Sequence, residues 1–381
     1  MRIAQLNSKL LLYACLAICA GYFFIGLWPF NFFPHNHGEV LMDGSGLSLQ
    51  PLSIAYSSRE IDLSKSGGIT IELALEGEPS DHIASVLSFY DGTLPVNLLI
   101  AQWKSGLLLR TRVPGAPGRR QYREAGIADG LRSGMRRLVA ISSDADGTTF
   151  YLDGTLVDRS PKLILRHETL RGRLILGDSP AGHQGWKGKL SGLAIYNRSL
   201  TPAEIARNSA LWQRRDFLEL ENERDLEALY FFNEAGAGTI SDHSPARNAL
   251  KLPAIYSILH KTALLPLWED SFHATDLAVN ILGFVPFGFF YFLYRTRTRP
   301  NRTTGNVLLT VLSAAILSTA IELIQVYLPT RYSQAADIVC NIAGAILGII
   351  LAGLGPIRVD PRSSPSRLHS GQFKSPEHES S

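Results

Sequence analysis

The chain has 381 residues, a formal net charge of +3 and a mean hydropathy of +0.06. The small charge and the lack of a basic stripe with interleaved aromatics exclude the usual kind of nucleic-acid-binding surface. The hydropathy is too high for an ordinary soluble protein and too low for a pure membrane protein, and the length allows two domains. Apolar runs near both ends flank a long polar middle, which predicts a soluble domain between membrane segments.

The first apolar run predicts a membrane anchor over residues 1–34. No Asp, Glu, Lys or Arg occurs from Leu10 to Pro34. A secretory signal peptide cleaved after Ala20 is the competing interpretation. The apolar run continues past that point to Phe30. It is too long for the apolar core of a signal peptide, and it ends in aromatic residues typical of a membrane interface. We therefore expect an uncleaved transmembrane helix.

Residues 35–255 predict an external all-β domain. Short β-branched or alternating runs are bounded by turn residues, and Asp-Gly pairs flank residues 148–152, which is typical of strands joined by tight turns. Many strands without helical alternation indicate an antiparallel sandwich. The other expected strands cover residues 69–75, 97–103, 106–113, 137–143 and 189–196.

One helix interrupts this β pattern. Thr201, Pro202 and Glu204 form a capping box with proline at the first helical position, which predicts a helix to about Trp212. Residues 228–236 resemble the opening strand of a jelly-roll sandwich, yet this strand comes after the helix. We expect it to complete the sandwich, because too few residues remain for a second one. The alternative is the remnant of a second copy.

The order of motifs resembles a laminin-G/concanavalin-A-like jelly roll. The resemblance rests on residues 150–154, on 188–196 and on the helix opening at 197–205. It implies binding of carbohydrate or protein, sometimes with Ca²⁺. The chain has three cysteines, none of them in this domain, so we expect neither disulfides nor a cysteine zinc site there. No other cofactor is expected. The candidate Ca²⁺ ligands are Asp144, Asp146, Asp153 and Asp242, for which turn formation is the competing role.

Three further spans are predicted at roughly 275–294, 305–328 and 336–355, each close to the ~20 residues that a helix needs to cross a bilayer. Residues 256–274 would be an interfacial linker, and 357–381 a disordered tail rich in Ser, Pro, Arg and His. Arginines crowd the loop between the second and third spans and follow the fourth. The positive-inside rule therefore puts both termini in the cytoplasm and residues 35–274 outside.

Polar residues recur near the outer ends of these spans. An ionisable group in a bilayer is costly, so it persists where it is paired, hydrated or used. An i, i+4 spacing places each Asp/Asn pair on one helix face, and Ser318 shares a face with Glu322. Gly344 and Gly348 continue one of these faces and would let helices approach closely. We predict a ligand-binding site, against the alternative that the groups only hold helices together. Its residues would be Asp276, Asn280, Glu322, Gln325, Arg331, Asp337 and Asn341.

These motifs, in this order, resemble the VanZ-like membrane domain. The residues that carry the resemblance lie within 275–356, with further support from Trp28 to Asn31. The family is named for a bacterial protein associated with resistance to a glycopeptide antibiotic. The resemblance implies a protein of the bacterial inner membrane, acting at the envelope near cell-wall precursors.

We expect a multi-pass envelope protein that binds a lipid-linked or wall-associated glycan and contacts membrane lipids. No catalytic pair stands out, so an enzyme is not the leading hypothesis. One alternative is an intramembrane enzyme with Glu322 as general acid or base. The other is a scaffold for envelope proteins.

Overall fold

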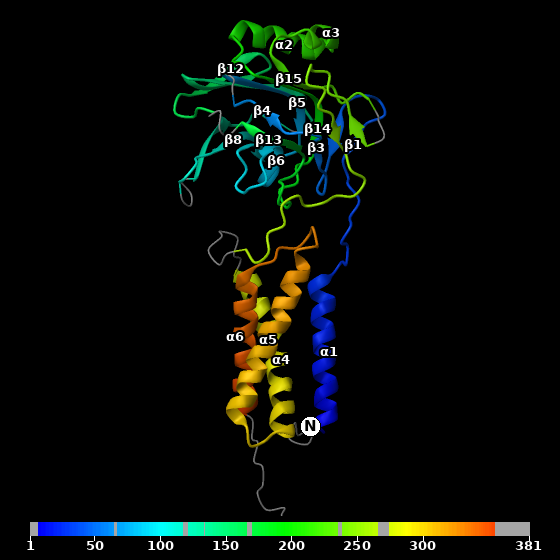
Figure 1. Ribbon diagram of the computed structural model, residues 1–381, viewed down its shortest axis with the longest axis vertical. Helices are drawn as coiled ribbons and strands as arrows, with labels where there is room; N and C mark the ends of the chain where they lie inside the picture. Colours follow the sequence, from blue (N-terminus) through cyan, green and yellow to red (C-terminus); the bar gives the residue numbers. More distant parts are fainter. Residues whose placement is uncertain are drawn as a thin grey trace, which may run out of the picture. The chain divides into compact units, whose positions relative to one another are not determined.

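The computed structural model divides into two compact units, and each is described by itself (Figure 1). The helical unit comprises Met1–Ile25, Trp268–Ala320 and Ala335–Ser381, and the sandwich unit comprises Gly26–Leu267 and Ile321–Gln334. The predicted tail at 357–381 lies outside the described residues, as does the second half of the predicted linker. The structure describes residues 7–64, 67–116, 121–132, 134–165, 170–234, 238–265 and 274–354.

Four helices, long and apolar enough to cross a membrane, run side by side in Figure 1. They confirm the four predicted helical spans. Side chains such as Leu282 and Ile316 are 67% and 70% exposed, which suits a surface in contact with lipid. Tyr22 stacks on Phe284 and so joins the first helix to the second. The helices are α1 (Ser8–Leu27), α4 (Ala274–Thr298), α5 (Thr303–Gln325) and α6 (Ala335–Leu354).

Glycines bring α4 and α6 into close contact. A Cβ at Gly344 would overlap the carbonyl group of Ile281, and one at Gly348 would overlap that of Val285. Only residues without a side chain allow backbones to approach in this way. The expected role of these two glycines is therefore confirmed.

The sandwich unit contains two antiparallel sheets, as the strand pattern predicts. Asp153 and Gly154 have φ angles of 50° and 83°, as a tight hairpin turn requires. The predicted late strand is β15 (Leu226–Tyr230), which pairs with β14 and completes a sheet. In the described part of the chain, one sheet has the order β1 (Glu39–Val40), β2 (Leu47–Leu49), β14 (Gly188–Tyr196), β5 (Ile69–Gly77), β10 (Arg137–Asp144), β11 (Gly147–Leu152) and β12 (Thr155–Ser160). The other has the order β16 (Thr239–Ile240), β17 (Leu250–Lys251), β3 (Ala55–Ser57), β13 (Arg171–Leu176), β6 (Ser80–Tyr90), β7 (Leu98–Lys104), β8 (Gly106–Arg112) and β9 (Tyr122–Ile127), with β4 (Ile61–Asp62) also on β13.

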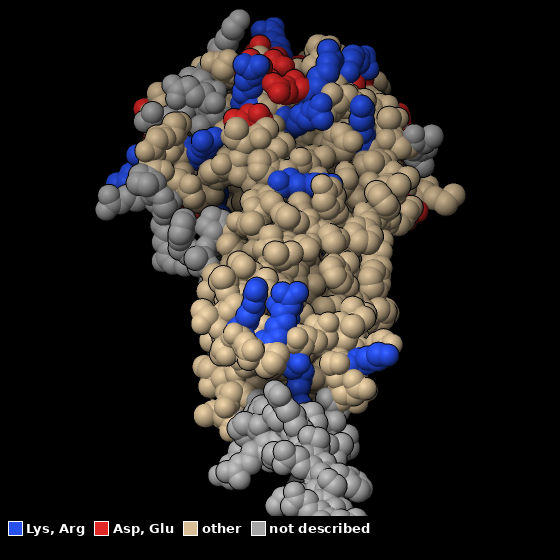
Figure 2. All heavy atoms as spheres, turned by 60° about the horizontal axis from the view of Figure 1, so that its bottom comes forward, with Lys and Arg blue, Asp and Glu red and all other residues tan. Residues whose placement is uncertain are grey.

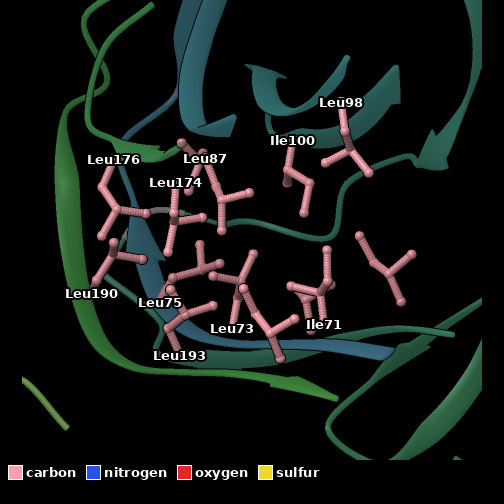
Figure 3. Packing of buried hydrophobic residues seen from close by; sticks show 14 of the residues in the cluster. Ile71, Leu73, Leu75, Leu87, Leu98, Ile100, Leu174, Leu176, Leu190 and Leu193 are labelled. Carbon is pink, nitrogen blue, oxygen red and sulfur yellow. The ribbon is translucent and has the colours of Figure 1, made fainter. Parts of the chain in front are cut away.

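The core lies between the two sheets (Figure 3). Alternate residues of β5, such as Ile71 and Leu73, face Leu98 and Ile100 of β7, and all four are fully buried. The strand period of two therefore points every second side chain inward. Burial of these aliphatic side chains is the main driving force for folding of the sandwich.

A helix covers the outer face of the eight-stranded sheet. It is α2 (Pro202–Arg214), with the predicted capping box at Thr201 and Glu204, and it is followed by α3 (Phe217–Glu221). Beneath α2 lies the fully buried carboxylate of Glu72, on β5. It accepts hydrogen bonds from Trp212 Nε1 (2.9 Å), Asn208 Nδ2 (3.1 Å) and the Tyr196 hydroxyl (3.3 Å). Glu72 thus fastens the helix to the sheet.

The chain enters the sandwich through residues 28–38, the N-terminal connector, and leaves it from residue 252, the start of the C-terminal connector. These two connectors run side by side. His35 forms an antiparallel bridge with Ile255. The buried carboxamide of Asn36 donates to the carbonyls of Ile54 and Pro253, both at 2.8 Å, and accepts from the Ile54 N–H. One side chain therefore ties both connectors to the sandwich.

Gly344→Ala should destabilise the helical unit, because the new methyl group meets the Ile281 carbonyl. We expect a loss of about 1–3 kcal/mol, as for overpacked cores. Gly353→Ala is the matched control, since nothing lies within 4 Å of a Cβ there. Unfolding of both variants in mixed micelles measures the difference. Equal stabilities would contradict the close packing of α4 and α6.

Glu72→Gln should change how the stability of the sandwich depends on pH. Burial raises the pKa of Glu72 from 4.5 to about 7, and its three hydrogen bonds only partly oppose this. Between these values the folded chain keeps a proton that the unfolded chain loses, so stability falls as the pH rises from about 4.5 to 7. The loss should be complete above pH 7 and amount to about 3 kcal/mol.

Fluorescence-detected unfolding of the full chain at pH 5 and pH 8 measures this effect. The wild type should lose stability relative to Glu72→Gln over that range. Glu76→Gln, on the same strand but partly exposed beside Lys189, should follow the wild type. Parallel curves for wild type and Glu72→Gln would contradict the assignment.

Candidate functional site

Two predicted site residues meet in the helical unit. Asn280 on α4 donates through Nδ2 to Oδ1 of Asp337 on α6 at 2.6 Å. The glycine contacts between these helices bring the two side chains within hydrogen-bond reach. Asp276 lies one turn before Asn280 on α4 and is exposed. Asp276, Asn280 and Asp337 therefore all lie near the N-terminal ends of α4 and α6.

Asn341 lies one turn after Asp337 and is only 7% exposed. Its Nδ2 donates to Ser318 Oγ on α5 at 2.8 Å, and Ser318 is fully buried. The carboxamide oxygen of Asn341 is buried with no hydrogen-bond partner. A buried polar atom without a partner costs about 1–3 kcal/mol, so this oxygen is a natural contact for a bound donor.

The other three predicted residues belong to the sandwich unit and contact backbone. Glu322 Oε2 accepts from the N–H of Gln334 at 2.9 Å. Gln325 donates to the Gly26 carbonyl at 2.8 Å, and Arg331 donates to the Trp28 carbonyl at 3.1 Å through Nη2. Glu322 and Gln325 are buried, at 3% and 8% exposure. The contacts of Gln325 and Arg331 tie the end of α5 and the turn after it to the end of α1 and to Trp28, which follows α1.

Four of the predicted residues thus lie on α4 and α6 in the helical unit, and three lie at the end of α5 and in the turn after it. Ser318 and Glu322 stand one turn apart on α5, as the i, i+4 spacing predicts. The guanidinium of Arg331 donates to the Trp28 carbonyl through both Nε and Nη2. A backbone partner of this kind leaves no signal in a single sequence.

A contact that no sequence motif predicts involves the turn between α5 and α6. Tyr332 stacks on His183 of the sandwich, with ring centroids 3.8 Å apart. Burial lowers the pKa of His183 to about 4, so the imidazole is neutral at pH 7. The only sequence signal is the turn-forming composition of residues 178–182, which does not indicate a partner.

Three of the four expected Ca²⁺ ligands accept hydrogen bonds from backbone N–H groups or pair with an arginine. Asp242 accepts the N–H groups of Leu229, Ser244 and Asn248. Asp153 pairs with Arg137 at 2.6 Å. Asp144 accepts from the N–H of Asp146 at 2.9 Å. Among the described residues no three His, Cys, Asp or Glu side chains gather as a metal site would require.

The aromatic side chains of the sandwich differ in access. Trp186 is fully buried and donates Nε1 to Gln102 Oε1 at 2.7 Å, so it belongs to the core. Trp103 is 53% exposed beside Lys104, and the guanidinium of Arg110 covers the ring of Tyr122. Trp103 and Tyr122 are therefore candidate stacking surfaces for a sugar ring.

Two family models match separate parts of the chain. Residues 227–355 match VanZ/LLP1, and residues 102–206 match the concanavalin A-like lectin/glucanases superfamily. The chain combines a VanZ-like domain with a concanavalin-A-like domain. With its four apolar helices it is a multi-pass membrane protein. The VanZ match begins in β15 and continues to the end of α6.

None of the curated proteins compared with this chain matches it. Among solved structures, a Bacteroides ovatus protein described as carbohydrate binding has a TM-score of 0.38 and 15% identity over 55% of this chain. This chain spans 60% of that protein's length. A SAP-like pentraxin from Limulus polyphemus has a TM-score of 0.36 and 12% identity, over 44% of this chain and 84% of that one. The CBM40 domain of a Ruminococcus gnavus IT-sialidase, bound to α2,3-sialyllactose, has a TM-score of 0.34 and 15% identity, over 45% of this chain and 100% of that one.

The Asn280–Asp337 hydrogen bond should contribute to helix association. In a double-mutant cycle with Asn280→Ala and Asp337→Ala, we expect a coupling energy of about 1–2 kcal/mol, at the upper end for membrane proteins. Unfolding in mixed micelles provides the four free energies. A coupling near zero would mean that these side chains do not hold α4 to α6.

Proposed function

We propose that this VanZ-like protein binds a lipid-linked or wall-associated glycan in a bacterial inner membrane. The observation that carries the proposal is the buried Asn341 carboxamide, whose oxygen lacks a partner on a helix apolar enough to cross the membrane. A ligand hydroxyl or amino group would supply the missing hydrogen bond. The match to a lectin superfamily supports a glycan as the ligand.

The proposed ligand contacts follow from the chemistry of each side chain. The amide nitrogens of Asn280 and Asn341 already donate to Asp337 and Ser318, so these two residues orient the site and offer oxygen atoms. Asp276, Asp337 and Glu322 would accept hydroxyl groups of the sugar. Arg331 would pair with a phosphate or carboxylate, for which a guanidinium is well suited. Gln325 would keep the end of α5 in place.

The proposed orientation places both termini in the cytoplasm and residues 35–274 outside. Arginines gather where α4 ends and α5 begins, and basic side chains mark that end of the helical unit in Figure 2. Loops rich in Lys and Arg face the cytoplasm. In this orientation the sandwich would meet wall-associated glycans, with Trp103 and Tyr122 available for stacking.

Native mass spectrometry of the full chain in mild detergent tests this function. We expect the wild type to retain an added polyprenyl-diphosphate disaccharide, and Asp337→Asn and Glu322→Gln to retain at least about tenfold less, since each loses a charged hydrogen bond. Thr310→Val is the matched control. It removes a buried hydroxyl of α5 that bonds to the Asn306 carbonyl, away from the proposed site.

The same experiment distinguishes binding from the enzyme and scaffold alternatives. Conversion of the added lipid that ceases in Glu322→Gln would indicate the intramembrane enzyme. If the wild type and all variants retain only bulk phospholipid, the binding function is wrong. A lowered melting temperature in Glu322→Gln without any selective effect on a ligand would then favour the scaffold.

A further inference from the structure

A segment of the chain itself covers part of the outer face of the nine-stranded sheet. Tyr256 is buried there with Ile54 and Ile175, and Ile258 and Leu259 pack against them. His260 donates its N–H to the Pro180 carbonyl at 2.8 Å. We call residues 254–260 the strap. The strap lies on the sheet through apolar contacts and is held at its end by a sandwich loop.

That loop, residues 178–184, is fixed by a buried carboxylate. Asp178 is 1% exposed, and its Oδ1 accepts from the N–H groups of Ser179 (2.7 Å) and Gln184 (2.9 Å). Its Oδ2 accepts from the Tyr256 hydroxyl at 2.8 Å. Gly182 lies directly against Tyr256 and Ile258 of the strap. Loop and strap therefore form one rigid piece, consistent with three hydrogen bonds to a single buried group.

The rigid loop presents His183 to the turn between α5 and α6. The imidazole stacks on Tyr332 at 3.8 Å with an interplanar angle of 25°. Since burial keeps the pKa of His183 near 4, the contact at neutral pH is a stack of two uncharged rings. Such pairs are stabilising beyond the area that they bury.

Four consecutive residues of this turn each contact a different segment. Arg331 donates to Trp28 in the N-terminal connector. Tyr332 stacks on the 178–184 loop. Ser333 accepts through Oγ from the N–H of Leu264, after the strap, at 3.1 Å. Gln334 donates to Glu322 at the end of α5. Several segments therefore meet at the turn, and the stack of Tyr332 on His183 joins it to the 178–184 loop of the sandwich.

We propose that His183 is a positioning residue for Arg331. The stack with Tyr332 fixes the turn, and the turn sets where the neighbouring guanidinium lies. This inference rests on the proposed function, in which Arg331 pairs with an anionic group of the ligand. It makes the sandwich part of the binding machinery, because a loop of the sandwich determines the geometry of a ligand-contacting residue.

The test compares His183→Ala with the ring-conserving His183→Phe. His183→Ala removes the stack, and it should weaken retention of the polyprenyl-diphosphate disaccharide by roughly three- to tenfold, the range of an aromatic pair. It should also speed hydrogen exchange at residues 326–334. Phe keeps a flat uncharged ring, so it should restore both properties. Leu156→Ala, at an exposed residue of β12 in the other sheet, is the control and should behave as the wild type.

Lipid retention tests the proposed function, and hydrogen exchange at the turn tests the positioning role of His183 separately. If the wild type retains no disaccharide lipid, the proposed function fails and exchange alone decides the positioning role. Unchanged exchange in His183→Ala overturns it. If the wild type retains the lipid and His183→Ala retains it equally well despite faster exchange, the turn is ordered by His183 but does not position the ligand. Failure of His183→Phe to restore retention would also overturn the stacking mechanism.

Discussion

A buried polar group must find a partner, and this requirement determines how the separate pieces of the chain are held. Glu72 fastens α2 to a sheet with three hydrogen bonds, and Asn36 ties both connectors to the sandwich. Asp178 does the same for the loop beneath the strap. Apolar burial drives folding but is non-directional, so these few directional contacts select one arrangement of the peripheral segments.

The same requirement explains why the unpartnered carboxamide oxygen of Asn341 is a candidate contact for a ligand. Many other buried carboxylates and amides have two or three partners each, although the carboxamide oxygens of Asn208 and Asn306 are also buried without one. On α6 the nitrogen of Asn341 is satisfied by Ser318 and the oxygen is not. Where no bulk water is present, an open acceptor is more costly than it is in a soluble core. A polar molecule that reaches this depth would therefore gain more from the contact than it would at a surface.

Much of the fold could be predicted from the sequence because it depends on local patterns. The period of two along β5 and β7, the Asp-Gly turns and the capping box at Thr201 all act over a few residues. The spans followed from length and apolar composition alone. The roles of Gly344 and Gly348 could also be predicted, since a small residue on a polar helix face has few other uses.

The partners of the site residues could not be predicted in the same way. Spacing placed Asp337 with Asn341 and Ser318 with Glu322. It did not reveal that Arg331 and Gln325 bind the backbone carbonyls of Trp28 and Gly26. Every residue offers a carbonyl, so the sequence does not mark which one is used. The stack of His183 on Tyr332 joins residues far apart in the chain, and a single sequence carries no record of such a pairing.

The paired connectors explain how a large domain can be inserted between two membrane helices. Because His35 bridges Ile255 and Asn36 holds Pro253, the chain enters and leaves the sandwich at one place. Domains with adjacent termini are tolerated as insertions because they leave the flanking segments close together. The C-terminal connector passes from Pro253, beside Asn36, along the strap to His260, which contacts Pro180 in the loop that carries His183. The contact between sandwich and turn is thus a consequence of where the insertion closes.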